Sequence, residues 1–273
     1  MSAPRIPPRW HPSPLLFASA GVHGGAVAAV LAQAQLWPWA LGALAANHVL
    51  LAGAGLSPRS RWLGSNWTRL PSAGAAGAAR VALTIDDGPD PEVTPRVLEL
   101  LAARGARATF FCIGERVAAH AALAREILAH GHAIENHSQR HLHHFSLLGP
   151  RRLRTEIERA QETIGALTGA APRFFRAPAG LRSPLLDPLL QRLGLQLASW
   201  TRRGFDTVEC RPARVLAALV RDLSAGDILR LHDGHAARTD AGTPVVLEVL
   251  PKLLAAFAAA GLAPVTLREA FGA

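Results

Sequence analysis

Two adjacent acidic residues, Asp86 and Asp87, follow a short apolar run and precede a Gly-Pro turn. The run Val81–Ile85 predicts a buried strand whose carboxyl end carries both carboxylates. In α/β folds, ligands and catalytic groups collect at this end of a strand. Because neighbouring side chains on a strand point to opposite faces, we expect the two acids to have different roles. An ordinary turn uses the same residue types, so the pair alone leaves both interpretations open.

A second group of polar residues follows the third apolar run, where His137 and His141 are four residues apart. A turn or helical segment here would bring the two imidazoles together, and Asp87 would add a carboxylate. Three protein ligands with one open position are typical of a catalytic metal site. His143 and His144 come next and are interpreted as surface residues or as groups that support the ligands. Two histidines at this spacing also occur by chance, so they gain weight only from other motifs.

Two further strand ends carry polar residues. Arg176–Gly180 follows the fourth run; its arginine could orient a carboxylate, and its backbone amides could face a developing oxyanion. His232 ends the sixth run beside Asp233, which suits a general acid or base. Each segment alone could be a turn with surface side chains. Polar groups at four strand ends are improbable by chance, so together they predict one catalytic site.

The elements that would position these groups alternate along the chain. Strand-like runs are Val81–Ile85, Ala108–Ile113, Ala133–Glu135, Phe174–Arg176, Leu195–Trp200, Asp227–Leu231 and Ala263–Leu267. Helical stretches are Val93–Arg104, Val117–His130, Arg151–Thr168, Ser183–Leu193, Pro212–Ser224 and Val245–Ala260. This alternation predicts an α/β fold with parallel strands and helical crossovers. Both a barrel and an open doubly wound sheet fit it, and no Gly-rich nucleotide loop follows the first strand.

The four motifs together resemble the polysaccharide deacetylase family (carbohydrate esterase family 4), whose catalytic unit is the NodB homology domain. The resemblance covers about residues 78–273 and implies a distorted (β/α)7 barrel. It also implies a divalent metal, most often zinc, with cobalt or another ion as alternatives. By this resemblance the metal ligands are Asp87, His137 and His141.

The resemblance assigns roles to the remaining motif residues. Asp86 would be the general base, oriented by Arg176, and His232 would be the general acid. Leu229 would line the acyl pocket. The family often has Tyr where Ala179 stands, and this chain contains no tyrosine. The backbone N–H of Ala179 is still expected to donate to the oxyanion.

The family motif that tunes the general acid is only partly present. Asp206 is kept and is expected to adjust the pKa of His232. Arg203 and Thr207 stand where the family has an acid and a tryptophan. Trp200 lies nearby and is expected at the substrate site, so the acyl pocket and the sugar preference depart from the family pattern.

The N-terminal part of the chain has a different composition. Segments 14–36 and 37–56 lack charged residues, and each is long enough to cross a hydrocarbon core of ~30 Å as a helix. Trp37-Pro38-Trp39 suits a turn at the membrane interface. Two Ala-rich helices packed on a soluble domain are the alternative. The predicted division is a two-helix transmembrane hairpin at 1–70, a small-residue linker at 71–79 and a catalytic domain at 80–273.

Arginine placement predicts the orientation of this hairpin. Arg5 and Arg9 precede the first span, Arg59, Arg61 and Arg69 follow the second, and the turn between the spans has none. The positive-inside rule then puts the catalytic domain on the cytoplasmic side of a bacterial inner membrane, with the periplasmic side as the alternative.

The net charge of +9 suits anionic lipids or an anionic lipid-linked substrate. No basic stripe with interleaved aromatics supports a nucleic-acid partner. The two cysteines form neither a disulfide framework nor a metal-binding pair. The charge therefore favours membrane lipids as partners, and the resemblance implies a glycan or lipid-linked sugar as the substrate.

The predicted function is metal-dependent hydrolysis of the N-acyl amide, most simply N-acetyl, of an amino sugar in a polysaccharide or lipid-linked glycan, with release of acetate. Alternatives are a deformylase or deacylase of a polyprenyl-linked sugar or another small acyl amide, and a catalytically inactive binding protein. The intact set of acids and histidines favours an enzyme over the last of these.

Overall fold

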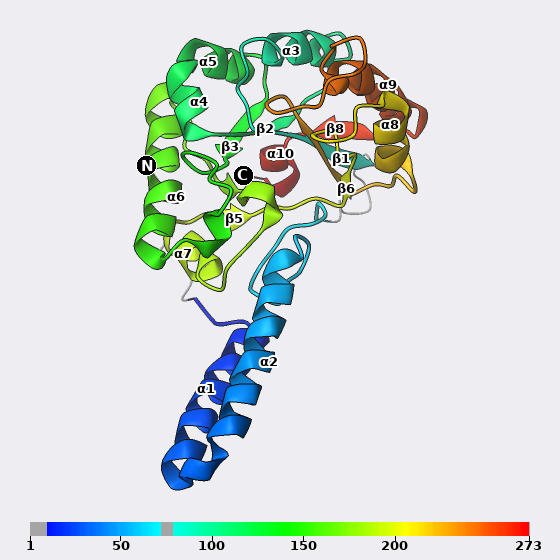
Figure 1. The fold of residues 1–273 in the computed structure, drawn as a ribbon. Helices are drawn as coiled ribbons and strands as arrows, with labels where there is room; N and C mark the ends of the chain where they lie inside the picture. The colour runs from blue at the N-terminus through cyan, green and yellow to red at the C-terminus, as the bar shows by residue number, and fades with distance from the viewer. Residues whose placement is uncertain (1–9, 72–78, 273) are drawn as a thin grey trace.

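The computed structural model describes residues 10–71 and 79–272. A helical hairpin projects from an α/β domain (Figure 1). Most of the predicted linker lies outside the described residues. The helical and strand segments follow the alternation expected from the sequence.

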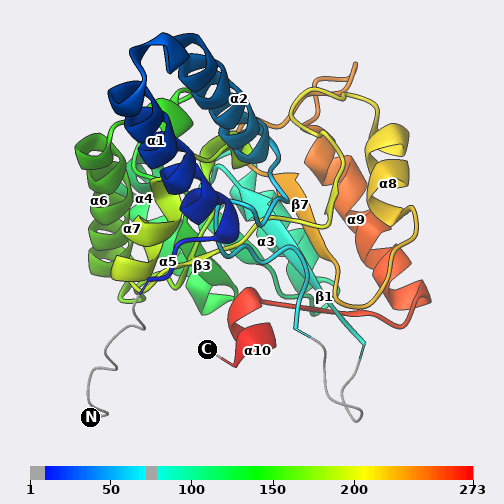
Figure 2. The same ribbon diagram turned by 90° about the horizontal axis from the view of Figure 1, so that it is seen from below.

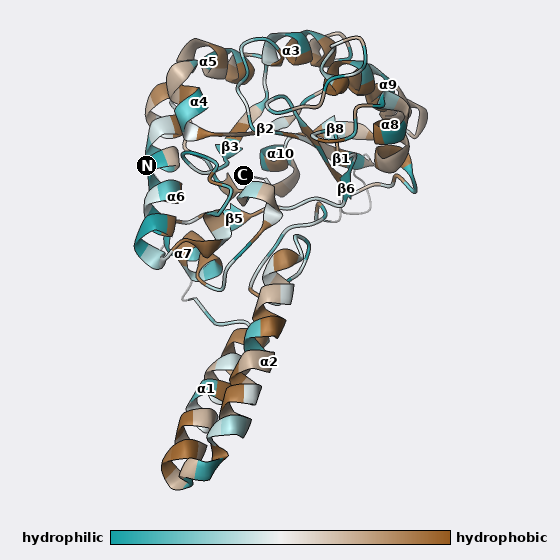
Figure 3. Cartoon of the chain, viewed as in Figure 1, coloured by the Kyte–Doolittle hydropathy of each residue, from teal (hydrophilic) through white to brown (hydrophobic). Residues whose placement is uncertain are grey.

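The hairpin consists of α1 (Pro14–Ala32), a short 3-10 turn (Ala34–Leu36) and α2 (Trp37–Leu56). Both helices are long and apolar enough to cross a membrane by length and composition. Its outer surface is apolar along much of its length (Figure 3). Several large apolar side chains of the hairpin are more than half exposed, among them Phe17 and Trp39.

Polar groups inside the hairpin satisfy one another. Asn47 Nδ2 donates to Ser19 Oγ across the two helices at 2.9 Å. The rings of His23 and His48 meet edge to face, with centroids 5.2 Å apart. These contacts join α1 to α2 and leave the apolar side chains on the outside.

The domain is built on one sheet in which every paired strand is parallel. The strands are β1 (Arg80–Asp86), β2 (Thr109–Cys112), β3 (Ala133–Asn136), β4 (Phe174–Phe175), β5 (Gln196–Leu197), β6 (Arg202–Arg203), β7 (Ile228–His232) and β8 (Ala263–Val265). Their order is β5-β4-β3-β2-β1-β7-β6, and β8 pairs with the start of β1. Within the described residues β5 and β6 end this order and do not pair with each other, so the sheet is a curled half-barrel of eight strands rather than the distorted (β/α)7 barrel that the resemblance implied.

Helices cover the outer face of this sheet, with α3 to α6 on one side and α8 and α9 on the other (Figures 1 and 2). Their bounds are α3 (Thr94–Ala102), α4 (Gly114–Ala119), α5 (Ala121–Ala129), α6 (Pro150–Thr168), α7 (Leu186–Arg192), α8 (Pro212–Val220), α9 (Val245–Ala259) and α10 (Leu267–Phe271). Alternate residues of β1, such as Leu83 and Ile85, pack beneath the helices in the main core. Ala82 instead joins a second core on the concave face.

This alternation determines on which face of the sheet the Asp86 side chain lies. Asp86 shares the face of Ala82 and Thr84, because side chains two apart on a strand point the same way. Phe111 and Trp200 belong to the same inner core as Ala82. Asp86 is therefore delivered to the concave side of the half-barrel, away from the helices.

Three elements differ from the sequence expectation. Strand β6 was not expected, because two arginines carry no apolar signal, although they pair with β7. The stretch 117–130, expected as one helix, is divided at His120, whose backbone is non-helical. The last predicted strand ends at Val265, since Thr266 caps α10 by a reciprocal contact with Glu269.

The segment after α2 lies against the domain. Trp67 forms a parallel bridge with Ala198, and Arg69 pairs with Asp227. Trp10 Nε1 and the Ser65 backbone N–H both donate to the carboxylate of Asp187 on α7. Both ends of the hairpin are thus attached to one acidic side chain of the domain.

Candidate active site

The predicted polar residues converge at the carboxyl ends of the strands. In the register of β1 and β7, Asp86 is paired with His232. The loop after β3 brings His137, and β4 leads directly into Arg176. All four side chains are buried.

One carboxylate oxygen of Asp86 accepts a hydrogen bond, and the other has no partner among the described residues. Its Oδ1 accepts a hydrogen bond from Arg176 Nη1 at 2.6 Å, and both side chains are 1% exposed. Its buried Oδ2 has no hydrogen-bond partner among the described residues. A carboxylate with one fixed oxygen and one unpaired oxygen can take a proton from a bound water.

Arg176 is immobilised on every side. Its Nη1 also donates to Thr84 Oγ1 at 2.7 Å, and its Nη2 donates to the Ser199 carbonyl at 2.8 Å. The guanidinium lies 4.0 Å from the ring centre of Phe111. Burial lowers the pKa of Arg176 to about 10, so it remains charged at neutral pH. These contacts are the ones expected if Arg176 orients the Asp86 carboxylate, which is the role predicted for it from the sequence.

The backbone of Asp87 adopts a left-handed φ of 74°, so the chain turns away from the direction of β1 at this residue. Its Oδ1 lies 3.2 Å from His137 Nε2 and 3.3 Å from His141 Nε2. One ligand atom from each of these three residues lies within 4.8 Å of the others. The loop geometry thus gathers the three predicted ligands.

The donor set suits a divalent cation. His137 Nδ1 lies 2.8 Å from the Arg176 carbonyl, which can only accept, so Nδ1 carries a proton and Nε2 is the ring nitrogen that faces Asp87. Ligand atoms about 2.1 Å from a tetrahedral zinc ion lie about 3.4 Å apart, close to the two distances between Asp87 Oδ1 and the histidines. Asp87 Oδ1 is buried and has no hydrogen-bond partner among the described residues.

The protonation states of Asp87 and His141 also suit the binding of a divalent cation. Burial raises the pKa of the Asp87 carboxyl, but contacts with His137 and His235 outweigh burial and hold that pKa well below its usual value. Burial, with the nearby His137, lowers the pKa of His141 to about 4. At neutral pH the cluster therefore offers the Asp87 carboxylate and a neutral His141 imidazole, the forms that bind metal.

His235 is a functional candidate that sequence reasoning missed. Its Nδ1 lies 3.2 Å from Asp87 Oδ2, the oxygen that faces away from the other two histidines. Its own backbone has a left-handed φ of 59°, which turns the side chain back toward Asp87. A second histidine three residues after His232 was the available signal.

The carboxylate of Asp206 contacts both the ring and the backbone N–H of His232. Its Nδ1 lies 2.9 Å from Asp206 Oδ1, and its backbone N–H donates to Asp206 Oδ2 at 2.7 Å. Burial lowers the pKa of His232, but the charge and hydrogen bond of Asp206 outweigh it, so the pKa is raised. This favours the charged imidazolium that a general acid needs.

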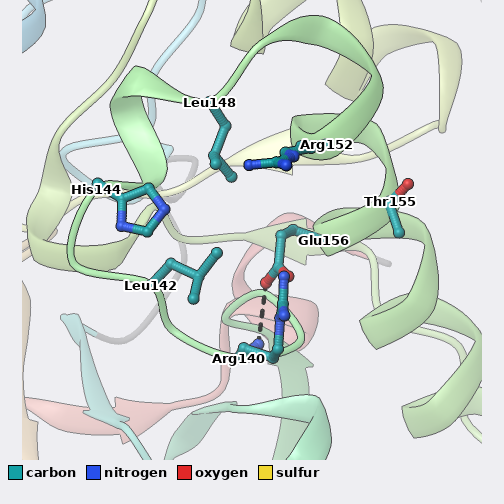
Figure 4. A pocket seen from close by; sticks show the side chains of 7 residues that line it. All are labelled: Arg140, Leu142, His144, Leu148, Arg152, Thr155 and Glu156. Atoms are coloured by element: carbon teal, nitrogen blue, oxygen red, sulfur yellow. Dashed lines mark hydrogen bonds and ion pairs between the residues drawn. The ribbon is translucent and has the colours of Figure 1, made fainter.

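Asp87 and the histidines His137, His141, His232 and His235 border a cavity of about 670 Å³. Ala179 lies on its wall with a left-handed φ of 53°, and its N–H donates to no acceptor among the described residues. Beside the cavity, Glu156 accepts from the backbone N–H and the Nε of Arg140 at 3.0 and 2.7 Å (Figure 4). This contact from α6 fixes the loop that carries His141.

Five predicted residues do not line this cavity: Asp86, Arg176, Asp206, Leu229 and Trp200. Leu229 is fully buried in the main core, and its carbonyl accepts from Thr84 Oγ1. Trp200 is 3% exposed and borders a neighbouring cavity, where Arg230 stacks on its ring at 3.7 Å. His143 does border the catalytic cavity, whereas His144 borders the adjacent one shown in Figure 4.

Known proteins share these features. Residues 73–198 match the family model described as polysaccharide deacetylase. A peptidoglycan-N-acetylglucosamine deacetylase of Bacillus cereus is 33% identical over 175 residues, which cover 63% of this chain and 81% of that protein. A chitooligosaccharide deacetylase of Bradyrhizobium is 34% identical over 161 residues, or 59% of this chain and 73% of that protein.

A solved structure shows the same fold. A family 4 carbohydrate esterase from Streptomyces lividans, in complex with acetate, superposes with a TM-score of 0.62 at 29% identity. The match covers 69% of this chain and 93% of that one. The α/β domain therefore has the fold of this esterase, as the four motifs predicted.

Proposed function

The chain belongs to the polysaccharide deacetylase family, carbohydrate esterase family 4, and from this premise we propose that it removes the acetyl group from an N-acetyl amino sugar. As a family member it is an amidohydrolase that acts on a carbon–nitrogen bond. Its relatives are named as deacetylases of peptidoglycan N-acetylglucosamine and of chitooligosaccharides. The acetate in the esterase complex supports acetyl as the leaving acyl group.

The pairing of Asp86 with His232 across β1 and β7 carries this proposal. Hydrolysis of an amide needs a base that takes a proton from water and an acid that protonates the leaving nitrogen. Asp86 has an unpaired oxygen for the first task. His232, charged through Asp206, supplies the proton for the second.

The remaining groups position the reaction. Arg176 fixes the position of the Asp86 carboxylate, and the Ala179 N–H donates to the acyl oxygen as negative charge develops on it. A divalent ion held by Asp87, His137 and His141 would supply Lewis-acid activation of water and of the acyl oxygen. Asp206 keeps the proton on His232 until the amide nitrogen becomes basic.

The hairpin supports a membrane-bound enzyme. Both helices have the length and composition of membrane spans, and their large side chains face outward. The arginines that flank them support a cytoplasmic catalytic domain. A lipid-linked amino sugar is the substrate that this placement favours, and an extracytoplasmic glycan is the second candidate, supported by the names of the relatives.

The test is an acetate-release screen with the full-length chain in nanodiscs after loading with Zn²⁺. Chitooligosaccharides, peptidoglycan fragments and lipid-linked N-acetylglucosamine are offered in parallel, with a small aryl acetamide as the non-sugar control. Acetate from at least one amino sugar, lost in Asp86→Asn, is the expected result. Stoichiometric zinc with no acetate or formate from any substrate would favour a binding protein instead.

A further inference from the structure

Two arginines beside the catalytic cavity have no acidic partner. Within the described residues, neither Arg203 nor Arg230 forms an ion pair or a hydrogen bond through its guanidinium. Among the other arginines of the domain, Arg176 pairs with Asp86, Arg202 with Asp227 and Arg268 with Glu135, whereas the buried Arg182 donates to the Ser60 carbonyl. Arg203 and Arg230 have neither kind of partner among the described residues, so their N–H groups are free to bind a ligand.

Arg203 and Arg230 lie side by side. They are register partners on the adjacent strands β6 and β7, and both border the cavity that contains Asp87 and His232. Arg230 is 8% exposed, and its buried Nε has no partner among the described residues. A buried charge without a counterion is costly, which a bound anion would relieve.

Aromatic rings hold both guanidiniums in place. Arg230 lies 3.7 Å from the ring centre of Trp200, and Arg203 lies 4.1 Å from that of Phe205. Stacking fixes the planes of these groups but leaves their N–H edges free to donate. The site is therefore preorganised before a ligand enters.

A third arginine extends the positive charge toward the hairpin. Burial lowers the pKa of Arg203, and repulsion from Arg230 and Arg59 lowers it further, so the three charges are near one another. Arg59 and Arg203 border a second cavity of about 390 Å³ that also contacts Ser57 and Pro58, immediately after α2. Arg203 borders both cavities and stands between the catalytic groups and the end of the hairpin.

We propose that Arg203 and Arg230 bind a phosphate group of the substrate, with Arg59 at the side nearest the hairpin. The substrate class is then an N-acyl amino sugar that carries a phosphate, either free or esterified to a membrane lipid. This inference rests on the proposed deacetylation. Guanidinium groups suit it because they donate two hydrogen bonds to one phosphate in a fixed plane.

The test compares three soluble probes and one lipid probe with the full-length, zinc-loaded chain in nanodiscs. The soluble probes are methyl N-acetylglucosaminide, N-acetylglucosamine 1-phosphate and N-acetylmuramic acid. The lipid probe is an N-acetylglucosamine phosphodiester with a long isoprenoid chain. Binding is measured as Kd with the Asp86→Asn variant, and turnover as kcat/KM with the unsubstituted enzyme.

We expect the phosphate to tighten binding at least 10-fold over the neutral glycoside. Arg203→Gln and Arg230→Gln should each remove most of that gain and change Kd for the glycoside less than 2-fold. Arg151→Gln, an exposed position on α6, is the matched control and should preserve the gain. A further gain for the isoprenoid probe identifies a lipid-linked substrate, and equal affinity identifies a soluble sugar phosphate.

Three results would overturn the inference, and the first two are no gain from phosphate and an equal gain from the carboxylate of N-acetylmuramic acid. Equal losses for the charged and neutral probes in folded Arg variants would also do so, because the arginines would then be structural. If no probe is deacetylated, the proposed function fails, whereas the Kd comparison still decides the phosphate site.

Discussion

Asp86 and His232 are register partners on the adjacent parallel strands β1 and β7. Neither depends on a flexible loop for its position, and each is held by one further side chain: Arg176 for Asp86 and Asp206 for His232. The two supporting pairs separate the roles, since a guanidinium fixes the position of the Asp86 carboxylate and a carboxylate raises the pKa of the His232 imidazole.

Replacement of Asp86 by Asn should lower kcat by about 10²–10⁴-fold, because an amide cannot take the proton from water. Metal content should stay at the level of the unsubstituted protein, since Asp86 is not among the three clustered ligands. The measurement is acetate release together with elemental analysis of the purified variant. Asp240→Asn, at an exposed position, is the matched control. Full activity of Asp86→Asn would remove the general base from the mechanism.

Asp206→Asn should shift the alkaline limb of the pH–rate profile to lower pH. Asp206 raises the pKa of His232, so its loss lets the imidazole lose its proton at a lower pH. The active form is the protonated one, and activity therefore falls as pH rises through that pKa. The profile of kcat/KM for both proteins measures the shift. An unchanged alkaline limb would mean that another group protonates the leaving amine.

The sequence predicted most of this site because its motifs sit at strand ends. Apolar runs identified β1 and β7, and the parallel arrangement then brought Asp86 and His232 to one edge. His235 escaped prediction because only a left-handed backbone turns it toward Asp87. Leu229 was assigned from the family pattern, but the alternation of β7 directs it into the core. Strand β6 was missed because its residues are paired by their backbones alone.

Removal of the metal by a chelator should abolish activity, and Zn²⁺ should restore it. His141→Ala should reduce bound metal, because one of the three clustered donors is lost. His235→Ala should keep the stoichiometry but weaken affinity about 10–100-fold, as is typical when a group that supports a ligand is removed. Competition with a zinc-binding dye gives both values. Equal loss of bound metal in His141→Ala and His235→Ala would show that His235 is itself a metal ligand.

Arg176→Met should destabilise the domain by about 3–5 kcal/mol, since the buried Asp86 carboxylate would lose its only ion-pair partner within the described residues. Urea denaturation of the full-length chain in detergent measures the change. In the Asp86→Asn background the same substitution should cost less, because no buried charge is left unpaired. Equal costs in the two backgrounds would show that Arg176 acts mainly through Thr84 and the Ser199 carbonyl.

The membrane topology can be tested with reporter fusions. Arginines flank the outer ends of the two helices, and the turn between them carries none, so both ends should stay in the cytoplasm. A green fluorescent protein fused after Ala273 should fluoresce, and alkaline phosphatase at the same position should be inactive. Phosphatase inserted after Leu36, in the turn, should be active and serves as the control. The opposite pattern would place the catalytic cavity in the periplasm, where peptidoglycan rather than a cytoplasmic lipid-linked sugar would reach Arg203 and Arg230.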